Sequence, residues 1–472
     1  MVNTRSAAAA VAAVVFTAAA AACSGTAPKS AGPGTTPVPS TASAASATPT
    51  VGVVRLPSSA VGAQARWLLA AVTHLPIPAA TVTAHFDKTF LAQVTPSELN
   101  SVLGKVTSLT LDAVASPEPS ALVMKVTADG RTQLNVSLQV DSSGLISGLL
   151  LQPPAAATPT VPTSWSGVES QIRSVAPQVR LLVASVSGGT CRPIQAIGAT
   201  TAAPLGSAFK LYVLDALARA IAAGTVSWNQ QLTVTSQVKS LPSGELQNDP
   251  DGTKVSVRQT AADMISLSDN TAANMLIALL GRAAVEAAAR DTGMADPGLD
   301  VPFLTTRELF VLKLDDWPRL AQRYLALSAA GRSALLAGTI DRDPLPALSA
   351  ATAWAAPRDI DSLEWFASPT DICHVYASLA ALARQPKLAP VASILEINNG
   401  GVGLNPSQWR SVWFKGGSEP GVLTLNYLAT TTSGRTYLVS VLTQNPAAAI
   451  SETSAATTLL GAVKGAFQLA AA

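Results

Sequence analysis

Two stretches poor in large apolar side chains divide this chain into parts that can each form a core. Residues 24–58 consist mostly of Ala, Ser, Thr, Pro and Gly, and residues 153–163 (PPAAATPTVPT) repeat that composition. Such segments bury too little apolar surface to offset the entropy of folding, so we expect a disordered tether and a shorter linker. The 472 residues therefore predict two folded regions, 59–152 and 164–472.

The N-terminal segment 1–23 is typical of a secretory signal. One basic residue, Arg5, precedes an apolar run of small residues that ends at Cys23, and this run is a poor membrane-spanning helix. The run also resembles a bacterial lipobox, with alanine in place of the usual leucine three positions before the cysteine. This resemblance implies lipidation of Cys23 and an exported protein anchored to the cell membrane, facing the cell envelope. The alternative is an ordinary signal peptide with an incidental cysteine.

The charge of the chain excludes one class of partner. The formal net charge is +2, only 13% of the residues are charged, and no Lys/Arg cluster stands out. A nucleic-acid-binding surface is therefore not expected. Export permits disulfides, but spacing alone does not decide whether Cys191 and Cys373 pair.

The first region predicts helices followed by an antiparallel sheet. Residues 61–75 and 95–106 have helical periodicity, whereas the later segments alternate apolar and polar residues, with a hairpin turn at Asp129-Gly130. Helices on one face of such a sheet make an α+β unit. In its order of elements this region resembles the small ketosteroid-isomerase-like cone domain.

The second region predicts one sheet built from both of its ends. A helix near 164–175 and a hairpin around Ser187–Gly189 come first, a long and largely helical middle follows, and three late strands lie within 411–444 before a closing helix from about 450. This arrangement brings segments that are distant in sequence together in space.

The stretch PLGSAFKLYVLDALARAIAAG, residues 204–224, predicts a capped helix that buries a lysine. Gly206 breaks the chain just before Ser207, and Gly224 stands where a helix C-terminus is expected. Helical spacing places Lys210 on the apolar stripe that continues through Leu214, Leu217 and Ile221. We expect the i, i+4 pair Asp215 and Arg219 on the opposite, solvated side.

A buried lysine beside a serine suggests a catalytic base. The second region contains one histidine, His374, in a segment with a helical pattern, and Ser207 has no Gly-x-Ser-x-Gly surroundings. No H-x-H or H-E-x-x-H ligand set is present, so we expect no metal or other cofactor. Burial, a helix N-terminus and a second cation would each favour the neutral form of Lys210, which can accept a proton.

Three motifs in this order identify the superfamily that the second region resembles. They are Ser207-x-x-Lys210, Ser268-Asp269-Asn270 and Lys415-Gly416-Gly417-Ser418. Over about residues 164–470 this pattern resembles the serine β-lactamase and penicillin-binding-protein superfamily, in particular class A β-lactamases. The whole layout also resembles the LpqF-type lipoproteins of actinobacteria and the β-lactamase-fold proteins of clavam biosynthesis.

The resemblance implies a fold, an activity and a role for each motif residue. The fold is an antiparallel sheet flanked by helices with an all-helical subdomain, and the activity is that of a serine hydrolase acting on an amide or ester, including cyclic amides such as β-lactams. The implied roles are Ser207 as nucleophile, Lys210 as base, Ser268 as proton relay and Lys415 as second positive charge. The resemblance also implies substrate binding by Asn270 and Gly417 and a structural role for Asp269. Ser418 would bind substrate, and its backbone N–H would form the oxyanion hole together with that of Ser207.

Two departures from the family pattern affect the expected activity. No Glu-x-x-Leu-Asn lies between Asn270 and Lys415, so Glu308 and Glu364 are the candidates by location for the carboxylate that activates the deacylating water. Gly416 replaces the usual Thr or Ser, which removes a hydroxyl that would bind a substrate carboxylate. Fast β-lactam hydrolysis is thus not assured.

These departures leave alternatives open. A D-Ala-D-Ala peptidase, a penicillin-binding role or an esterase would tolerate the missing glutamate. A non-catalytic cell-envelope lipoprotein that binds a ligand is the alternative from another class. The expected partner is a small-molecule or peptidoglycan-derived substrate in every case.

Overall fold

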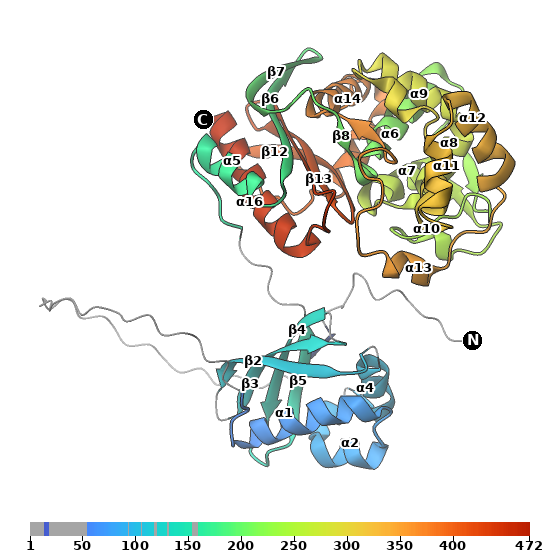
Figure 1. Cartoon of the computed structure of the whole chain (residues 1–472). Helices are drawn as coiled ribbons and strands as arrows, with labels where there is room; N and C mark the ends of the chain where they lie inside the picture. The colour runs from blue at the N-terminus through green and yellow to red at the C-terminus, as the bar shows by residue number, and fades with distance from the viewer. Residues whose placement is uncertain are drawn as a thin grey trace, which may run out of the picture. The chain divides into compact units, whose positions relative to one another are not determined.

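A computed structural model describes residues 14–17, 54–92, 94–104, 106–117, 120–129, 132–152 and 159–472. The predicted lipidation site Cys23 and most of the predicted tether lie outside the described residues. The chain divides into two compact units, Met1–Ala156 and Ala157–Ala472 (Figure 1). Each unit is described by itself.

The first unit packs helices on an antiparallel sheet. Its helices are α1 (Ala60–Ala71), η1 (Val72–His74), α2 (Ala79–His85), α3 (Lys88–Leu91) and α4 (Pro96–Leu103). Its strands are β1 (Val14–Thr17), β2 (Leu109–Pro117), β3 (Ala121–Ala128), β4 (Thr132–Val140) and β5 (Ile146–Gln152), in the order β1-β5-β4-β3-β2.

Local sequence explains these elements. Thr95 and Glu98 form a capping box that starts α4, as the Thr-x-x-Glu spacing predicts. In β3 buried positions alternate with more exposed ones, so one face of the sheet joins the helices in a shared apolar core that includes Leu68, Leu99 and Val136. The unit is therefore α+β, while its resemblance to the ketosteroid-isomerase cone stays a prediction.

The second unit is built on a five-stranded antiparallel sheet. The strands run in the order β12 (Trp409–Glu419), β13 (Val422–Thr431), β14 (Thr436–Gln444), β6 (Gln178–Ser187) and β7 (Thr190–Ile197). The first three come from the end of the chain and the last two from the start of the unit, so one sheet joins the two ends as expected. Helices α5 (Trp165–Arg173) and α16 (Glu452–Ala471) pack together on one face (Figure 1).

The middle of the unit supplies the helices on the other side of the sheet (Figure 1). They are α6 (Lys210–Ala223), α7 (Val257–Ser266), α8 (Asn270–Leu280), α9 (Arg282–Asp291), α10 (Thr306–Leu314), α11 (Arg319–Leu325), α12 (Ala329–Leu335), α13 (Leu348–Ala353), α14 (Pro369–Leu382) and α15 (Pro390–Glu396). Among the described residues no single helix is long and apolar enough to cross a membrane; α8 and α9 pass such a test only as a pair bent by 92°. The antiparallel sheet with flanking helices is the expected β-lactamase-like fold.

Helix α6 corrects one expectation about its surroundings. It begins and ends close to the predicted positions, with Gly224 in the left-handed conformation at its C-terminus. The face that carries Asp215 is not solvated, however. Asp215 is fully buried, because α14 covers this face and Ser378 donates a hydrogen bond to its carboxylate at 2.6 Å, beside the ion pair with Arg219.

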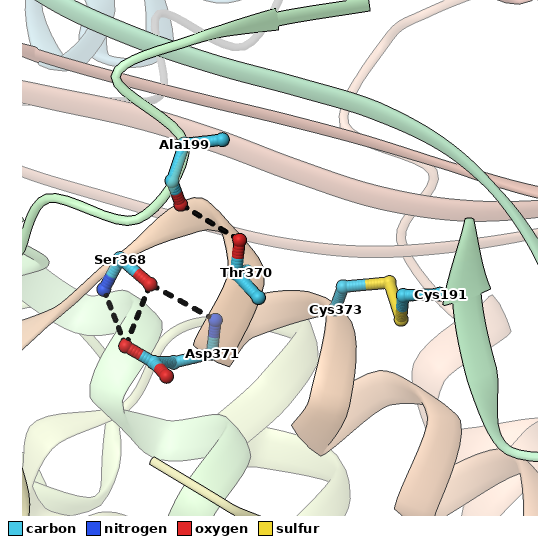
Figure 2. The surroundings of a disulfide bond; sticks show 6 residues. All are labelled: Cys191, Ala199, Ser368, Thr370, Asp371 and Cys373. Atoms are coloured by element: carbon cyan, nitrogen blue, oxygen red, sulfur yellow. Dashed lines mark hydrogen bonds between the residues drawn. A yellow bond between two sulfur atoms is a disulfide. The ribbon is translucent and has the colours of Figure 1, made fainter. Parts of the chain in front are cut away.

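A disulfide joins the edge of the sheet to helix α14. Cys191 on β7 is bonded to Cys373 on α14, which answers the question that spacing left open (Figure 2). Close to the bond, Ser368 and Asp371 form the capping box at the start of α14. Thr370 in the first turn donates its hydroxyl to the main-chain oxygen of Ala199, so this end of α14 is fixed to the chain beyond β7.

Candidate active site

The side chains of Ser207 and Lys210 meet at the start of α6. The short strand β8 (Ala203–Pro204) leads into a 3₁₀ turn, η2 (Gly206–Phe209), which carries Ser207 one turn before Lys210. Residues three apart lie on the same helix face, and Nζ of Lys210 lies 3.0 Å from Oγ of Ser207. Lys210 is 0% exposed. The serine hydroxyl is thus in contact with an amine that bulk water does not reach.

The loop between α7 and α8 surrounds that amine with oxygen atoms. Nζ of Lys210 lies 2.6 Å from the main-chain oxygen of Ser268, 3.2 Å from its Oγ, and 2.7 Å from Oδ1 of Asn270. Ser268 has a φ of 56°, in the left-handed region that side chains other than glycine rarely adopt. Such strain persists only where surrounding contacts impose it, and it is frequent at functional sites.

The carboxylate of Asp269 accepts hydrogen bonds from backbone N–H groups around the loop. Its carboxylate caps α8 by accepting the N–H of Ala272 at 2.8 Å, and it also accepts the N–H groups of Glu245 and Leu246 at 2.6 and 2.9 Å. Among the described residues no carboxylate hydrogen-bonds to Nζ of Lys210. These contacts agree with the structural role expected for Asp269.

Strand β12 brings a second lysine to the same place. Nζ of Lys415 lies 3.0 Å from Oγ of Ser268 and 2.7 Å from the main-chain oxygen of Gly416. The Ser268 hydroxyl therefore contacts both amines. The structure gathers Ser207, Lys210, Ser268 and Lys415 from three separate segments into one connected site.

Burial of the two lysines favours their neutral forms. Burial lowers the pKa of Lys210 well below its ordinary value, and the nearby charge of Lys415 lowers it further, against a smaller opposing effect of Asp269. Burial also lowers the pKa of Lys415 to about 7. Both shifts favour the neutral amine, the form in which Lys210 can accept a proton, and Lys415 changes its charge near neutrality.

Two glycines let the backbone of β12 approach η2. Gly206 has a φ of 51°, and a Cβ there would lie 2.8 Å from the main-chain nitrogen of Ser418. A Cβ on Gly417 would lie 2.5 Å from the main-chain nitrogen of Ser207. The amide groups of Ser207 and Ser418 thus lie on backbone segments in direct contact, which is the arrangement that an oxyanion hole requires.

The glycine at position 416 has a steric explanation. A Cβ there would lie 2.8 Å from the ring of Phe414 and 3.0 Å from the main-chain oxygen of Thr424. A Thr or Ser at this position would therefore require the Phe414 ring to move and the Thr424 oxygen, which lies on the paired strand β13, to shift slightly.

The two candidate deacylation glutamates, Glu308 and Glu364, are hydrogen-bonded to residues other than Ser207 and Lys210. Glu308 accepts the N–H of Thr305 at 2.6 Å in the capping box of α10, and it accepts a 2.6 Å hydrogen bond from Arg282. Glu364 accepts the N–H groups of Gly206 and Trp365 at 3.2 and 2.9 Å. Among the described residues neither carboxylate hydrogen-bonds to Ser207 or Lys210, so these contacts give the deacylation prediction no support.

Two charged residues close to this site, Lys313 and Glu419, are not part of the three sequence motifs. Nζ of Lys313, on α10, donates to both carboxylate oxygens of Glu419 at 2.6 and 2.8 Å and lies 3.9 Å from Glu364. Glu419 directly follows Ser418 at the end of β12. The one signal in the sequence was a lysine inside the apolar run FVLKL, which also fits an ordinary surface helix.

The fold and the gathered motif residues define the class of protein. An antiparallel sheet with flanking helices and a serine–lysine pair at the start of a buried helix is the design of the serine β-lactamase and penicillin-binding-protein superfamily. Residues 169–330 match the model of the β-lactamase enzyme family, which confirms the predicted relationship for that range. The chain therefore carries a β-lactamase-like domain.

The two family models each match only part of the chain. The matched range contains Ser207, Lys210 and Ser268 but ends before Lys415. Residues 56–146 match a second family model, described as the N-terminal part of the ORF 12 gene product. No curated protein matches the chain.

Several solved structures are similar to the chain. A β-lactamase from Sphaerobacter thermophilus is 22% identical, covers 65% of this chain and 98% of its own, and gives a TM-score of 0.45. A β-lactamase from Chitinophaga pinensis is 17% identical, with coverages of 65% and 98% and a TM-score of 0.44. A PBP-A acyl-enzyme complex with penicillin G is 16% identical, with coverages of 65% and 99% and a TM-score of 0.44.

Proposed function

We propose that this protein is an exported serine–lysine acyl hydrolase that forms an acyl-enzyme on Ser207 with an amide or ester substrate. The observation that carries the proposal is the 3.0 Å contact between Nζ of the buried Lys210 and Oγ of Ser207. A lysine held neutral by burial and by a neighbouring cation can remove the serine proton, which an exposed lysine does not do at neutral pH.

Acylation follows from the positions of the polar atoms. Neutral Lys210 accepts the proton of the Ser207 hydroxyl as Oγ forms a bond to the substrate carbonyl carbon. The carbonyl electron pair moves to its oxygen, which accepts hydrogen bonds from the N–H groups of Ser207 and Ser418. The bond to the leaving nitrogen or oxygen then breaks, and the proton returns to that atom from Lys210 through the Ser268 hydroxyl, which contacts both lysines.

Deacylation is expected to be slow with penicillins. Among the described residues no carboxylate hydrogen-bonds to Lys210 or Ser207, so a water that attacks the acyl-enzyme has Lys210 and Ser268 as its nearest bases. This observation favours a second candidate function, a penicillin-binding, D-Ala-D-Ala peptidase or esterase activity, over rapid β-lactam turnover. A non-catalytic ligand-binding role remains the outcome if Ser207 does not react.

The substrate that we propose is a β-lactam or peptidoglycan-derived small molecule. Lys415 provides a positive charge for a substrate carboxylate, but Gly416 provides no hydroxyl beside it. Recognition of the carboxylate therefore depends on Lys415 and Ser418. A neutral ester would not need either contact.

The proposed location is the outer face of the cell membrane, with the protein attached through lipidated Cys23. If the chain is cleaved before Cys23, strand β1 is absent from the mature protein. The test is incorporation of a labelled fatty acid in a bacterial host by the wild type and by Cys23→Ala. Equal labelling of both proteins would contradict the anchor.

The activity is tested with three probes on the protein without its N-terminal signal. We expect a fluorescent penicillin to form a lasting adduct on Ser207, slow hydrolysis of nitrocefin, and release of p-nitrophenol from p-nitrophenyl acetate. Ser207→Ala is the control and loses all three reactions. Rapid nitrocefin hydrolysis without adduct would identify a β-lactamase, and a lack of reaction with every probe would contradict the hydrolase proposal.

A further inference from the structure

Three buried ionisable side chains lie directly behind the proposed oxyanion hole. We call Lys313, Glu364 and Glu419 the buried acid–lysine cluster; their side chains are 0%, 1% and 6% exposed. They come from α10, from the segment before β11 (Phe366–Ala367), and from the end of β12. The mechanism above does not use any of them.

The cluster is attached to both sides of the oxyanion hole. On one side, Glu364 accepts the N–H of Gly206, the residue before Ser207. On the other side, Glu419 is the residue after Ser418 and accepts two hydrogen bonds from Lys313. Nζ of Lys313 lies 3.9 Å from Oε1 of Glu364, so the lysine faces both carboxyl groups.

Leu205, the residue before Gly206, is held by backbone and side-chain hydrogen bonds of its own. The main-chain N–H of Leu205 donates to the oxygen of Trp365 at 2.8 Å, and the Thr424 hydroxyl donates to the oxygen of Leu205 at 3.0 Å. These bonds hold the chain before Gly206. The N–H of Gly206 donates to Glu364, so Glu364 and Thr424 together fix the Leu205–Gly206 peptide, which directly precedes the peptide that carries the N–H of Ser207.

The charges of the cluster suit this task. One lysine faces two buried carboxyl groups, and burial raises the pKa of Glu419 to about 8 and raises that of Glu364 as well. The Glu419 carboxyl therefore tends to retain its proton at neutral pH. A protonated carboxyl does not oppose the negative charge that develops in the oxyanion hole.

We propose that Glu364, supported by Lys313 and Glu419, is a positioning residue that aligns the N–H groups of Ser207 and Ser418 with the substrate oxyanion. The proposal rests on the hydrolase function proposed above. It assigns to Glu364 a role different from activation of the deacylating water. Its contacts with Gly206 and Trp365 account for this role, whereas deacylation would need an oxygen directed at a water beside Ser207.

The test uses two variants of Glu364 and two probes of Ser207. The first probe is the rate of covalent labelling by a fluorescent penicillin, and the second is the inhibition constant of phenylboronic acid, whose tetrahedral adduct places a hydroxyl in the oxyanion hole. We expect Glu364→Leu to slow labelling and to weaken the boronic acid by about 10-fold to 100-fold. Glu364→Gln should recover most of both values, because its amide oxygen can still accept from the N–H groups of Gly206 and Trp365.

A matched control separates positioning from general loss of stability. Asp215→Asn alters another buried carboxylate of the same unit, bonded to Arg219 and Ser378, and should lower the melting temperature without changing the boronic acid constant. If Glu364→Leu does not fold, the double variant Lys313→Met with Glu419→Met replaces the ion pair by apolar side chains and should weaken the boronic acid about 10-fold.

The outcomes distinguish the two proposals. If wild-type protein is not labelled and does not bind the boronic acid, the hydrolase function itself fails. If the wild type reacts and folded Glu364→Leu, or the double variant in its place, has the wild-type boronic acid constant, only the positioning role is overturned. An equal loss in Glu364→Gln and Glu364→Leu would also overturn it.

Discussion

At the scale of single residues, the central feature is the amine of Lys210, to which no carboxylate in the described part of the chain is hydrogen-bonded. Lys210 is surrounded by hydroxyl, amide and carbonyl oxygens, and its nearest positive neighbour is Lys415 across the Ser268 hydroxyl. Neutral acceptors stabilise an ammonium less than a carboxylate does, so burial dominates and the amine loses its proton readily. This difference supports the proposed role of Lys210 as a base.

Replacing Lys210 by arginine tests the base directly. Lys210→Arg provides a side chain of similar reach whose guanidinium holds its proton at every accessible pH. We expect labelling of Ser207 by a fluorescent penicillin to slow by about 10²–10⁴, the usual contribution of a general base. The measurement is the labelling rate by intact-protein mass spectrometry. A rate within threefold of the wild type would show that Lys210 does not take the proton.

The pKa of Lys415 predicts a pH-dependent preference for anionic substrates. With a pKa of about 7 the side chain is charged below neutrality and neutral above it. Because the charged fraction falls roughly tenfold between pH 6 and pH 8, the apparent dissociation constant for a penicillin should rise by up to about tenfold over that range. For neutral p-nitrophenyl acetate it should stay constant.

Titration of Lys210 affects the chemical step of both substrates. The ratio of the penicillin constant to the p-nitrophenyl acetate constant therefore reports the titration of Lys415 alone. Lys415→Arg keeps its charge throughout and should flatten the ratio. Parallel curves for the two substrates in the wild type would exclude recognition of a carboxylate by Lys415.

At the scale of elements, the site depends on the close approach of η2 and β12. The approach is possible because Gly206 and Gly417 have no side chain. The sequence indicated a chain break at Gly206 but not its second function, since the contact with β12 joins residues more than two hundred positions apart. Such a contact follows only from the way the sheet assembles.

Gly206→Ala tests this contact. The new Cβ would meet the nitrogen of Ser418 at 2.8 Å in a backbone conformation that L residues avoid, so the free energy of unfolding should fall by about 1–3 kcal/mol. Labelling of Ser207 should slow at least about tenfold, because the oxyanion donors are displaced. Gly224→Ala, also at positive φ but in open space, is the control and should lose stability without losing reactivity.

The disulfide joins β7 to α14. Strand β7 is the edge strand of the sheet opposite to β12. Replacing both cysteines by alanine should lower the free energy of unfolding by about 2–5 kcal/mol in urea titrations. Labelling of Ser207 should remain within threefold of the wild type, since neither cysteine contacts the site. A larger loss of reactivity would indicate that α14 positions the catalytic groups.

At the scale of the whole molecule, two units with separate apolar cores share one chain. The first core lies within 59–152, while the second unit has cores on both faces of its sheet. All four residues of the connected site, as well as the buried acid–lysine cluster, belong to the second unit. The catalytic chemistry should therefore not require the first.

A fragment of residues 159–472 tests this independence. We expect it to unfold in a single cooperative transition and to label at Ser207 within about threefold of the full chain, because its core and site are complete. Circular dichroism during urea titration and the penicillin labelling rate are the measurements. A folded fragment that no longer reacts would assign the first unit a part in catalysis.

The sequence by itself determined the two-part organisation, the sheet drawn from both ends of the second region, and the three motifs around Ser207. These features depend on local composition, periodicity and short spacings, which a linear chain displays directly. Only the tertiary structure decided that Asp215 is buried, that Cys191 pairs with Cys373, and that Glu364 lies against Gly206. Those facts depend on which distant surfaces pack together, because burial and pairing arise from contacts that no local pattern encodes.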